Sequence, residues 1–262
     1  FVQYVDDLYM LGAPEAVAAA FAAWQVATAA AGEGVNLGKC CVWGPSPAAV
    51  AAVEPLLPAG MAHAGTEEER VLLGAPLLAG LKVLGNPIGT EEFCVAFYAR
   101  KAAKTGELVD AILGLVAHDA HLSRQSAYLI LKYCVEPRIA HLLRAAPPAW
   151  VRAAAHTHDE HIMRGFSRIV GAEDWLCRDT DSRAERAEDV EWLAAADLAV
   201  RQAALPLREG GCGLPSAAAL ADVAYVGGWM GTARLLDKQW VAMKLPADLK
   251  AEAVCAHLSA SQ

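Results

Sequence analysis

The sequence predicts an α+β fold, in which a small antiparallel sheet with helices precedes a mostly α-helical region. Two segments, residues 1–12 and 81–89, each pair short apolar runs across a turn-like centre, which is typical of β-hairpins. After Thr90, apolar residues recur at helical spacing through most of the chain. The composition, 55% hydrophobic and 20% charged over 262 residues, is that of a folded chain with a sizeable core.

The first expected hairpin holds two adjacent carboxylates. Its apolar runs flank Tyr4-Val5-Asp6-Asp7, and a tight turn there would project Asp6 and Asp7 near a common point. Mg²⁺ prefers carboxylate oxygens as ligands. The pattern therefore favours a divalent metal site at the hairpin tip, and the alternative is an ordinary polar turn.

A helix and a loop-rich stretch are expected between the two hairpins. Pro14 opens the helix and Gly32 ends it, with Val17, Phe21 and Trp24 on one face. Four prolines between residues 45 and 58 then indicate loops with one short helix. Thr66–Glu69 has the pattern of a helix-capping box.

The remaining chain predicts helices separated by identifiable breaks. One helix begins after Ser123 and is broken or kinked at Pro137. Another runs over residues 148–169 and ends at Gly171.

Two further segments complete the helical part. Residues 178–188 are a linker candidate, and two helices should flank the glycine loop at 210–213. That loop favours a structural turn over a phosphate cradle because no Lys-Ser/Thr follows it.

Residues 1–11 resemble the catalytic hairpin of reverse transcriptases, whose signature is Tyr-x-Asp-Asp between apolar strands. Two more blocks follow in the order of that family. Residues 32–39 resemble the Gly-x-x-x-Asn-x-x-Lys stretch of retrotransposon-type enzymes, and residues 81–89 resemble the Leu-Gly hairpin called the primer grip. The resemblance to this family continues in three later segments, 122–127, 137–148 and 205–214.

The resemblance implies RNA-directed DNA synthesis, a nucleotidyl transfer with two Mg²⁺ ions (or Mn²⁺), deoxynucleoside triphosphates, an RNA template and a DNA primer. It makes Asp6 the stronger metal ligand and Asp7 the supporting carboxylate. Tyr4 and Val5 would shape the floor beneath the primer end, and Lys39 would lie near the triphosphate. A surface lysine that opens a strand is the alternative for Lys39.

Nucleic-acid contacts are expected further along the chain. Leu84 and Gly85 belong to the primer-grip-like hairpin, where Gly85 would let a backbone come close to a nucleic-acid strand. Arg100, Lys101 and Lys104 follow on a helix that would meet the duplex backbone. An ordinary turn and an exposed polar helix face are the respective alternatives.

The resemblance divides the chain into three parts. Residues 1–90 correspond to the C-terminal part of the polymerase palm, 91–177 to a helical thumb-like region, and 178–262 to a helical C-terminal region. In the family, a further aspartate and the fingers come from upstream of the hairpin. We expect them on an N-terminal portion of the same polypeptide, so the chain alone should not polymerise.

Other acidic and histidine residues offer no convincing replacement for that aspartate. Asp110, Asp119, Asp159 and Asp174 lie in helical segments, where a lone carboxylate is usually a cap or salt-bridge partner. His156, His158, Asp159 and His161 resemble metal ligands in composition, but helical spacing turns His156 away from the other two histidines.

The net charge of −8 opposes a nucleic-acid partner, although the basic residues cluster locally. Seven cysteines without regular spacing favour reduced thiols in an intracellular protein of the cytoplasm or nucleus, and no apolar run suggests a membrane partner. The alternative function is a non-catalytic nucleic-acid-binding or helical interaction module from a degenerate retroelement.

Overall fold

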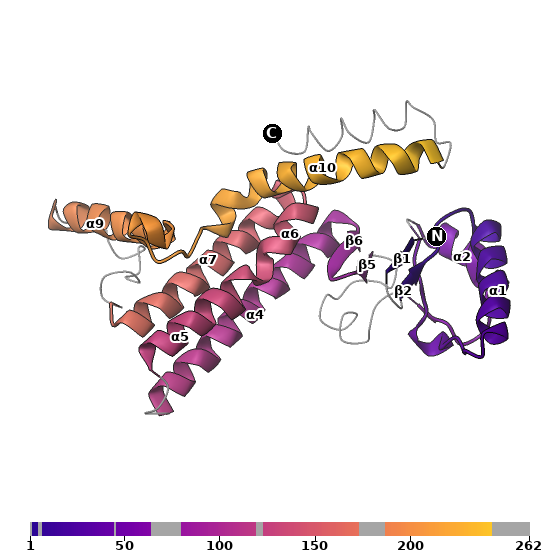
Figure 1. Cartoon of the computed structure of the whole chain (residues 1–262), viewed down its shortest axis with the longest axis horizontal. Helices are drawn as coiled ribbons and strands as arrows, with labels where there is room; N and C mark the ends of the chain where they lie inside the picture. The colour runs from indigo at the N-terminus through magenta and orange to yellow at the C-terminus, as the bar shows by residue number, and fades with distance from the viewer. Residues whose placement is uncertain are drawn as a thin grey trace. The chain divides into compact units, whose positions relative to one another are not determined.

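The computed structural model describes six stretches of the chain, which are residues 2–4, 7–44, 46–63, 80–118, 123–172 and 187–242. The chain forms two compact units, Phe1–Ala96 and Phe97–Gln262. The boundary lies inside the long helix α4 (Glu91–His118), whose first six residues belong to unit 1. Over the described residues as a whole, the elements agree with the α+β class, with helices in the majority and the strands in unit 1 (Figure 1).

Unit 1 contains three two-stranded ladders. Their strands are β1 (Val2–Tyr4), β2 (Asp7–Tyr9), β3 (Cys41–Val42), β4 (Ala62–His63), β5 (Gly80–Val83) and β6 (Asn86–Gly89). The β1–β2 and β5–β6 pairs are antiparallel hairpins, whereas β3 and β4 pair in parallel. The described strands therefore do not join into the single small antiparallel sheet that the sequence predicted. Hairpins form from local pairing, whereas a continuous sheet needs strands that are distant in sequence to pair.

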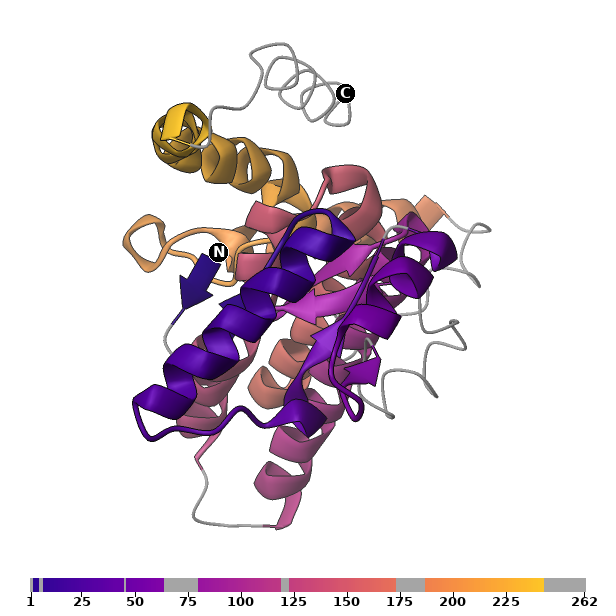
Figure 2. The same cartoon turned by 90° about the vertical axis from the view of Figure 1, so that its right-hand side faces the viewer.

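Unit 1 has four described helical elements within its first 56 residues. They are α1 (Pro14–Ala30), η1 (Leu37–Lys39), α2 (Pro47–Val53) and η2 (Glu54–Leu56). Helix α1 packs against α2 and η2, and Figure 2 shows the two α-helices side by side. The prediction of a helix opened by Pro14 is confirmed, and Phe21 is its buried residue. The capping box at Thr66–Glu69 lies outside the described residues.

Unit 2 is built from helices. After α4 come α5 (Arg124–Ile130), the π-helical turn η3 (Leu131–Val135), the 3₁₀ turn η4 (Glu136–Ile139), α6 (Ala140–Ala145), α7 (Pro148–Val170), α9 (Ala187–Ala204), η6 (Leu207–Glu209) and α10 (Ala217–Ala242). Ser123 caps α5 through its side chain, and Gly171 ends α7 in the left-handed conformation. Both predicted helix ends are confirmed.

Pro137 breaks the helix as expected. The helix from Ser123 changes to π geometry at Leu131 and to 3₁₀ geometry at Glu136, and regular α-helix resumes at Ala140. Proline lacks an N–H donor and its ring clashes with the carbonyl four residues back, so the hydrogen-bond pattern must change before it.

The core of unit 2 lies where α4, α5, η3 and α7 meet (Figure 1). Its buried residues include Val109, Leu131, Ile162, Phe166 and Ile169. Helix α10 packs on α6 and α7. Within the described ranges, no helix is long and apolar enough to cross a bilayer.

Candidate nucleic-acid interface

The described strands of the first hairpin form the antiparallel pair that the sequence predicted. Tyr4 pairs with Asp7 at the end of the β1–β2 ladder. Val5 and Asp6 lie outside the described residues, and for Tyr4 and Asp7 only the backbone is described. Adjacent carboxylates suit a hard cation by their chemistry.

The structure leaves the metal site a prediction. Among the residues that the structure describes, no group of three or more histidine, cysteine or acidic side chains gathers at one point. A two-ion centre needs more carboxylates than Asp6 and Asp7 supply. Lys39 is exposed at the end of η1, and its predicted position near the triphosphate is likewise untested.

The second hairpin carries the clearest local signal in unit 1. Leu84 (φ 49°) and Gly85 (φ 86°) both have positive φ, which is the pattern of a type I′ turn between β5 and β6. Among the described residues, Leu84 is the single non-glycine residue with positive φ. Its side chain is 48% exposed. A strained, exposed leucine at a hairpin tip suggests a constraint other than stability.

The base of this hairpin is fixed against α4. A Cβ at Gly80 would overlap the Phe93 ring and lie 2.7 Å from the Ile88 carbonyl oxygen. The Thr90 hydroxyl then accepts a hydrogen bond from the Phe93 amide, at 3.3 Å, in the first turn of α4. The end of the β5–β6 hairpin opposite Leu84 and Gly85 is therefore closely packed, and it anchors the strands that carry these two residues.

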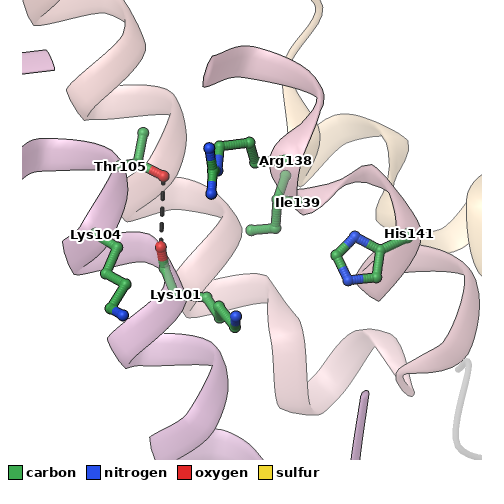
Figure 3. Close-up of a pocket in the computed structure, with 6 residues that line it drawn as sticks. All are labelled: Lys101, Lys104, Thr105, Arg138, Ile139 and His141. Atoms are coloured by element: carbon green, nitrogen blue, oxygen red, sulfur yellow. Dashed lines mark hydrogen bonds between the residues drawn. The ribbon is translucent and has the colours of Figure 1, made fainter. Parts of the chain in front are cut away.

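A basic pocket lies in unit 2 between α4 and the η4–α6 segment. It has a volume of about 300 Å³. Figure 3 shows two facing walls, which are formed by Lys101, Lys104 and Thr105 on one side and by Arg138, Ile139 and His141 on the other. Three permanently charged side chains and one imidazole make this pocket suitable for an anion such as a phosphate.

The predicted basic cluster is only partly in this pocket. Lys101 and Lys104 are three residues apart on α4 and therefore share a face. Arg100 is four residues before Lys104, but it is not among the lining residues. Arg138 and His141 were missed. They share the same spacing of three just after Pro137, and this spacing was the available signal, but their position opposite α4 is a tertiary effect.

A buried histidine connects the two walls of the pocket. His158 of α7 is 1% exposed. Its Nδ1 lies 2.9 Å from the Thr105 hydroxyl and its Nε2 lies 3.1 Å from the Glu136 carbonyl oxygen. Because a carbonyl can only accept, Nε2 carries the proton, and in the neutral ring Nδ1 accepts from the Thr105 hydroxyl. The Lys101 carbonyl oxygen, at 3.5 Å, is the more distant acceptor for the same hydroxyl (Figure 3). Burial lowers the pKa of His158, which favours this neutral form.

His161 and Asp159 contact neighbouring elements, whereas His156 does not lie in the core. His156 is exposed, whereas His161 lies over Gly106, where a Cβ would be 2.9 Å from the imidazole ring. Asp159 accepts hydrogen bonds from the Ser216 hydroxyl and the amides of Ala217 and Ala218, at 2.7 to 3.1 Å, and so caps α10.

Asp110 was expected to be a cap or an ion-pair residue and is an ion-pair residue. Its carboxylate lies 2.7 Å from Arg164, and hydrogen bonding to that guanidinium lowers the pKa of Asp110. Asp119 and Asp174 lie outside the described residues.

The glycine loop at residues 210–213 is a structural turn. Its four amides donate to carbonyl groups of Leu207, Pro206, Ala203 and Leu205 respectively. The Cys212 carbonyl in turn accepts from the Tyr128 hydroxyl and from Lys132 Nζ, the latter at 3.1 Å. Donors that are already paired are not available to cradle a phosphate.

Comparison with known proteins adds no relative to these observations. No family model, no curated protein and no solved structure matches the chain.

Proposed function

We propose that this chain is part of a retroelement reverse transcriptase, an RNA-directed DNA polymerase, and that it holds the primer and template. The observation that carries the proposal is that two segments that resemble that family, around Asp7 and around Leu84, both belong to antiparallel hairpins. In the second hairpin the two-residue turn places Leu84 at the tip rather than within the ladder.

The proposal assigns two kinds of contact to nucleic acid. The exposed tip at Leu84 and Gly85 offers an apolar side chain and an accessible backbone to the primer strand. The basic pocket of Lys101, Lys104, Arg138 and His141 offers charge to a backbone phosphate. Because the whole chain carries a net charge of −8, binding would depend on such local concentrations of positive charge.

In the intact polymerase, Asp6 and Asp7 would hold Mg²⁺ together with a further aspartate from another segment. The ions would supply the charge that stabilises phosphoryl transfer. By itself the chain is expected to bind a primer–template without extending it. Extension of a DNA primer on an RNA template by the isolated chain, with Mg²⁺ or Mn²⁺, would contradict this expectation.

Binding is tested by fluorescence anisotropy of a labelled DNA primer–RNA template at several salt concentrations. Replacing Lys101, Lys104 and Arg138 together by glutamine should weaken binding. It should also reduce the salt slope, which is the slope of log affinity against log salt concentration, by the contribution of up to about three phosphate contacts. Arg208→Gln is the matched control, since Arg208 is basic, lies in the same unit and is 83% exposed. An unchanged affinity and slope in the triple variant would contradict the assignment of the pocket.

The basic pocket also supports a second candidate, a nucleic-acid-binding module without chemistry. The two candidates differ at Asp6 and Asp7. In a polymerase segment, Mg²⁺ should increase affinity for the primer–template with an incoming nucleotide, and the D6N/D7N variant should lose that increase. A non-catalytic module would bind equally with and without Mg²⁺, and the D6N/D7N variant would bind as the wild type does.

A further inference from the structure

The two walls of the basic pocket have no continuous secondary structure in common. Lys101, Lys104 and Thr105 lie on α4, whereas Arg138 and His141 lie on η4 and α6, more than 30 residues later. A phosphate that contacts both walls requires a fixed separation between them. The position of one wall relative to the other is therefore a condition for binding.

His158 bonds to both walls at once. Thr105, which donates to Nδ1, is itself a lining residue of the α4 wall. Glu136, whose carbonyl accepts from Nε2, is two residues before Arg138 on the opposite wall. With 1% exposure, His158 makes these bonds away from solvent, where hydrogen bonds are strong and an unpaired group is costly.

The broken helix makes the Glu136 carbonyl suitable for this role. In a regular α-helix the amide of Ala140 would donate to Glu136, four residues back. Here the Ala140 amide donates to the Pro137 carbonyl instead. The Glu136 carbonyl can therefore accept from the imidazole of α7, and the break at Pro137 is connected to the pocket.

From these contacts we infer that His158 is a positioning residue for the basic pocket, because its neutral imidazole fixes Arg138 and His141 opposite Lys101 and Lys104. The inference rests on the proposed function insofar as the anion is a nucleic-acid phosphate. His158 itself does not touch the anion, since its two ring nitrogens are occupied by Thr105 and Glu136.

The test compares His158→Gln and Arg138→Gln, singly and together, in the full 262-residue chain. The glutamine at 158 has an amide donor and an amide acceptor, but it lacks the rigid ring that holds the two imidazole nitrogens toward Glu136 and Thr105. His158→Gln should raise the Kd for the primer–template about tenfold and reduce the salt slope. In the double variant the two losses should not add, because both remove the same contact.

A second pair of variants separates positioning from general stability. Thr105→Val removes the hydroxyl at nearly constant volume and should weaken binding in the same way. Thr105→Ser keeps the hydroxyl and should restore wild-type binding. All binding is measured below the unfolding transition of each variant, as followed by circular dichroism. A His158→Gln or Thr105→Val chain that is folded and binds with wild-type affinity and slope would overturn the inference.

Inorganic pyrophosphate, followed by calorimetry, distinguishes this inference from the proposed function. If the wild type binds pyrophosphate but not the primer–template, and Arg138→Gln abolishes that binding, the proposed function fails. The effect of His158→Gln on pyrophosphate affinity then tests the positioning role. A folded His158→Gln chain with weaker pyrophosphate binding supports that role, and one with wild-type affinity overturns it. A wild-type chain that binds neither probe overturns both.

Discussion

Unit 1 and unit 2 are stabilised in different ways. The β1–β2 and β5–β6 hairpins of unit 1 are closed by local turns, and two-stranded ladders are marginal on their own. Unit 2 buries a contiguous core between long helices. Hydrogen bonds between residues distant in sequence, such as that between Asp159 and the start of α10, add to this core.

The short motifs that resemble reverse transcriptases and the packed core that stabilises the fold lie in different units. The motifs at Asp6, Asp7 and Leu84 lie in unit 1, where Asp7 begins β2 and Leu84 occupies a turn. The basic pocket lies in unit 2, where position depends on packing. Changes in the packed core of unit 2 should therefore mainly affect folding, whereas changes at the hairpin tips of unit 1 and at the basic side chains of the pocket should mainly affect binding.

The largest effect is expected at the packing of α10 on α6. A Cβ at Gly228 would lie 2.6 Å from the Arg144 carbonyl oxygen, so Gly228→Ala must push the helices apart and should cost about 2 kcal/mol. The adjacent Gly227 has no atom within 4 Å of its added Cβ. Gly227→Ala should instead stabilise the helix by about 0.5–1 kcal/mol.

Urea unfolding of the two alanine variants measures this contrast directly. The opposite signs at neighbouring positions distinguish close packing from helix propensity. Equal stability changes in Gly227→Ala and Gly228→Ala would show that α10 does not approach α6 as closely as described.

A smaller effect is expected from the protonation of His158. Burial lowers its pKa below the ordinary value of 6.5, so the unfolded chain takes up the proton at a higher pH than the folded chain. The contribution of neutral His158 to stability is complete above pH 6.5 and declines as the pH falls toward the folded-state pKa. An ordinary histidine titrates between about pH 7.5 and about pH 5.5. Over this range the wild type should lose more unfolding free energy than His158→Gln.

Neighbouring groups set the controls for this pH series. Burial also lowers the pKa of His161, which acts in the same direction. Burial and Asp159 raise the pKa of Glu136, whose effect is opposite, because its protonated form is favoured in the folded chain. His161→Gln and Glu136→Gln remove these contributions. If the wild type and His158→Gln then lose the same free energy, the His158 prediction is wrong.

The smallest stability change is expected at the hairpin tip in unit 1. Leu84→Asn should stabilise the β5–β6 turn by about 1 kcal/mol, because asparagine tolerates positive φ better than leucine. It should nevertheless weaken primer–template binding if the leucine side chain contacts nucleic acid. Leu56→Asn is the matched control, since Leu56 lies in the same unit and is 49% exposed against 48% for Leu84.

Urea unfolding and anisotropy together measure the two effects at Leu84. A gain of stability with unchanged binding would leave the strained leucine without a nucleic-acid role. A loss of stability would show that the turn does not require positive φ at this position.

The sequence by itself determined the local elements of this protein. The break at Pro137, the start of α5 and the end of α7 were readable because each depends on the φ preferences and hydrogen-bonding groups of a few neighbouring residues. The β5–β6 hairpin was readable too, but the positive φ of Leu84 was not, because leucine disfavours that conformation. The expectation that Asp110 and Asp159 serve as ion-pair or cap residues was equally general, although their partners, Arg164 and the start of α10, were not predictable.

The tertiary structure alone decided the composition of the candidate site in unit 2. It left Arg100 out of the pocket and brought Arg138 and His141 opposite Lys101 and Lys104. It also buried His158 between Thr105 and Glu136 rather than in a metal-binding cluster. These outcomes depend on how α4, η4 and α7 pack, and packing joins residues whose separation in sequence carries no local signal.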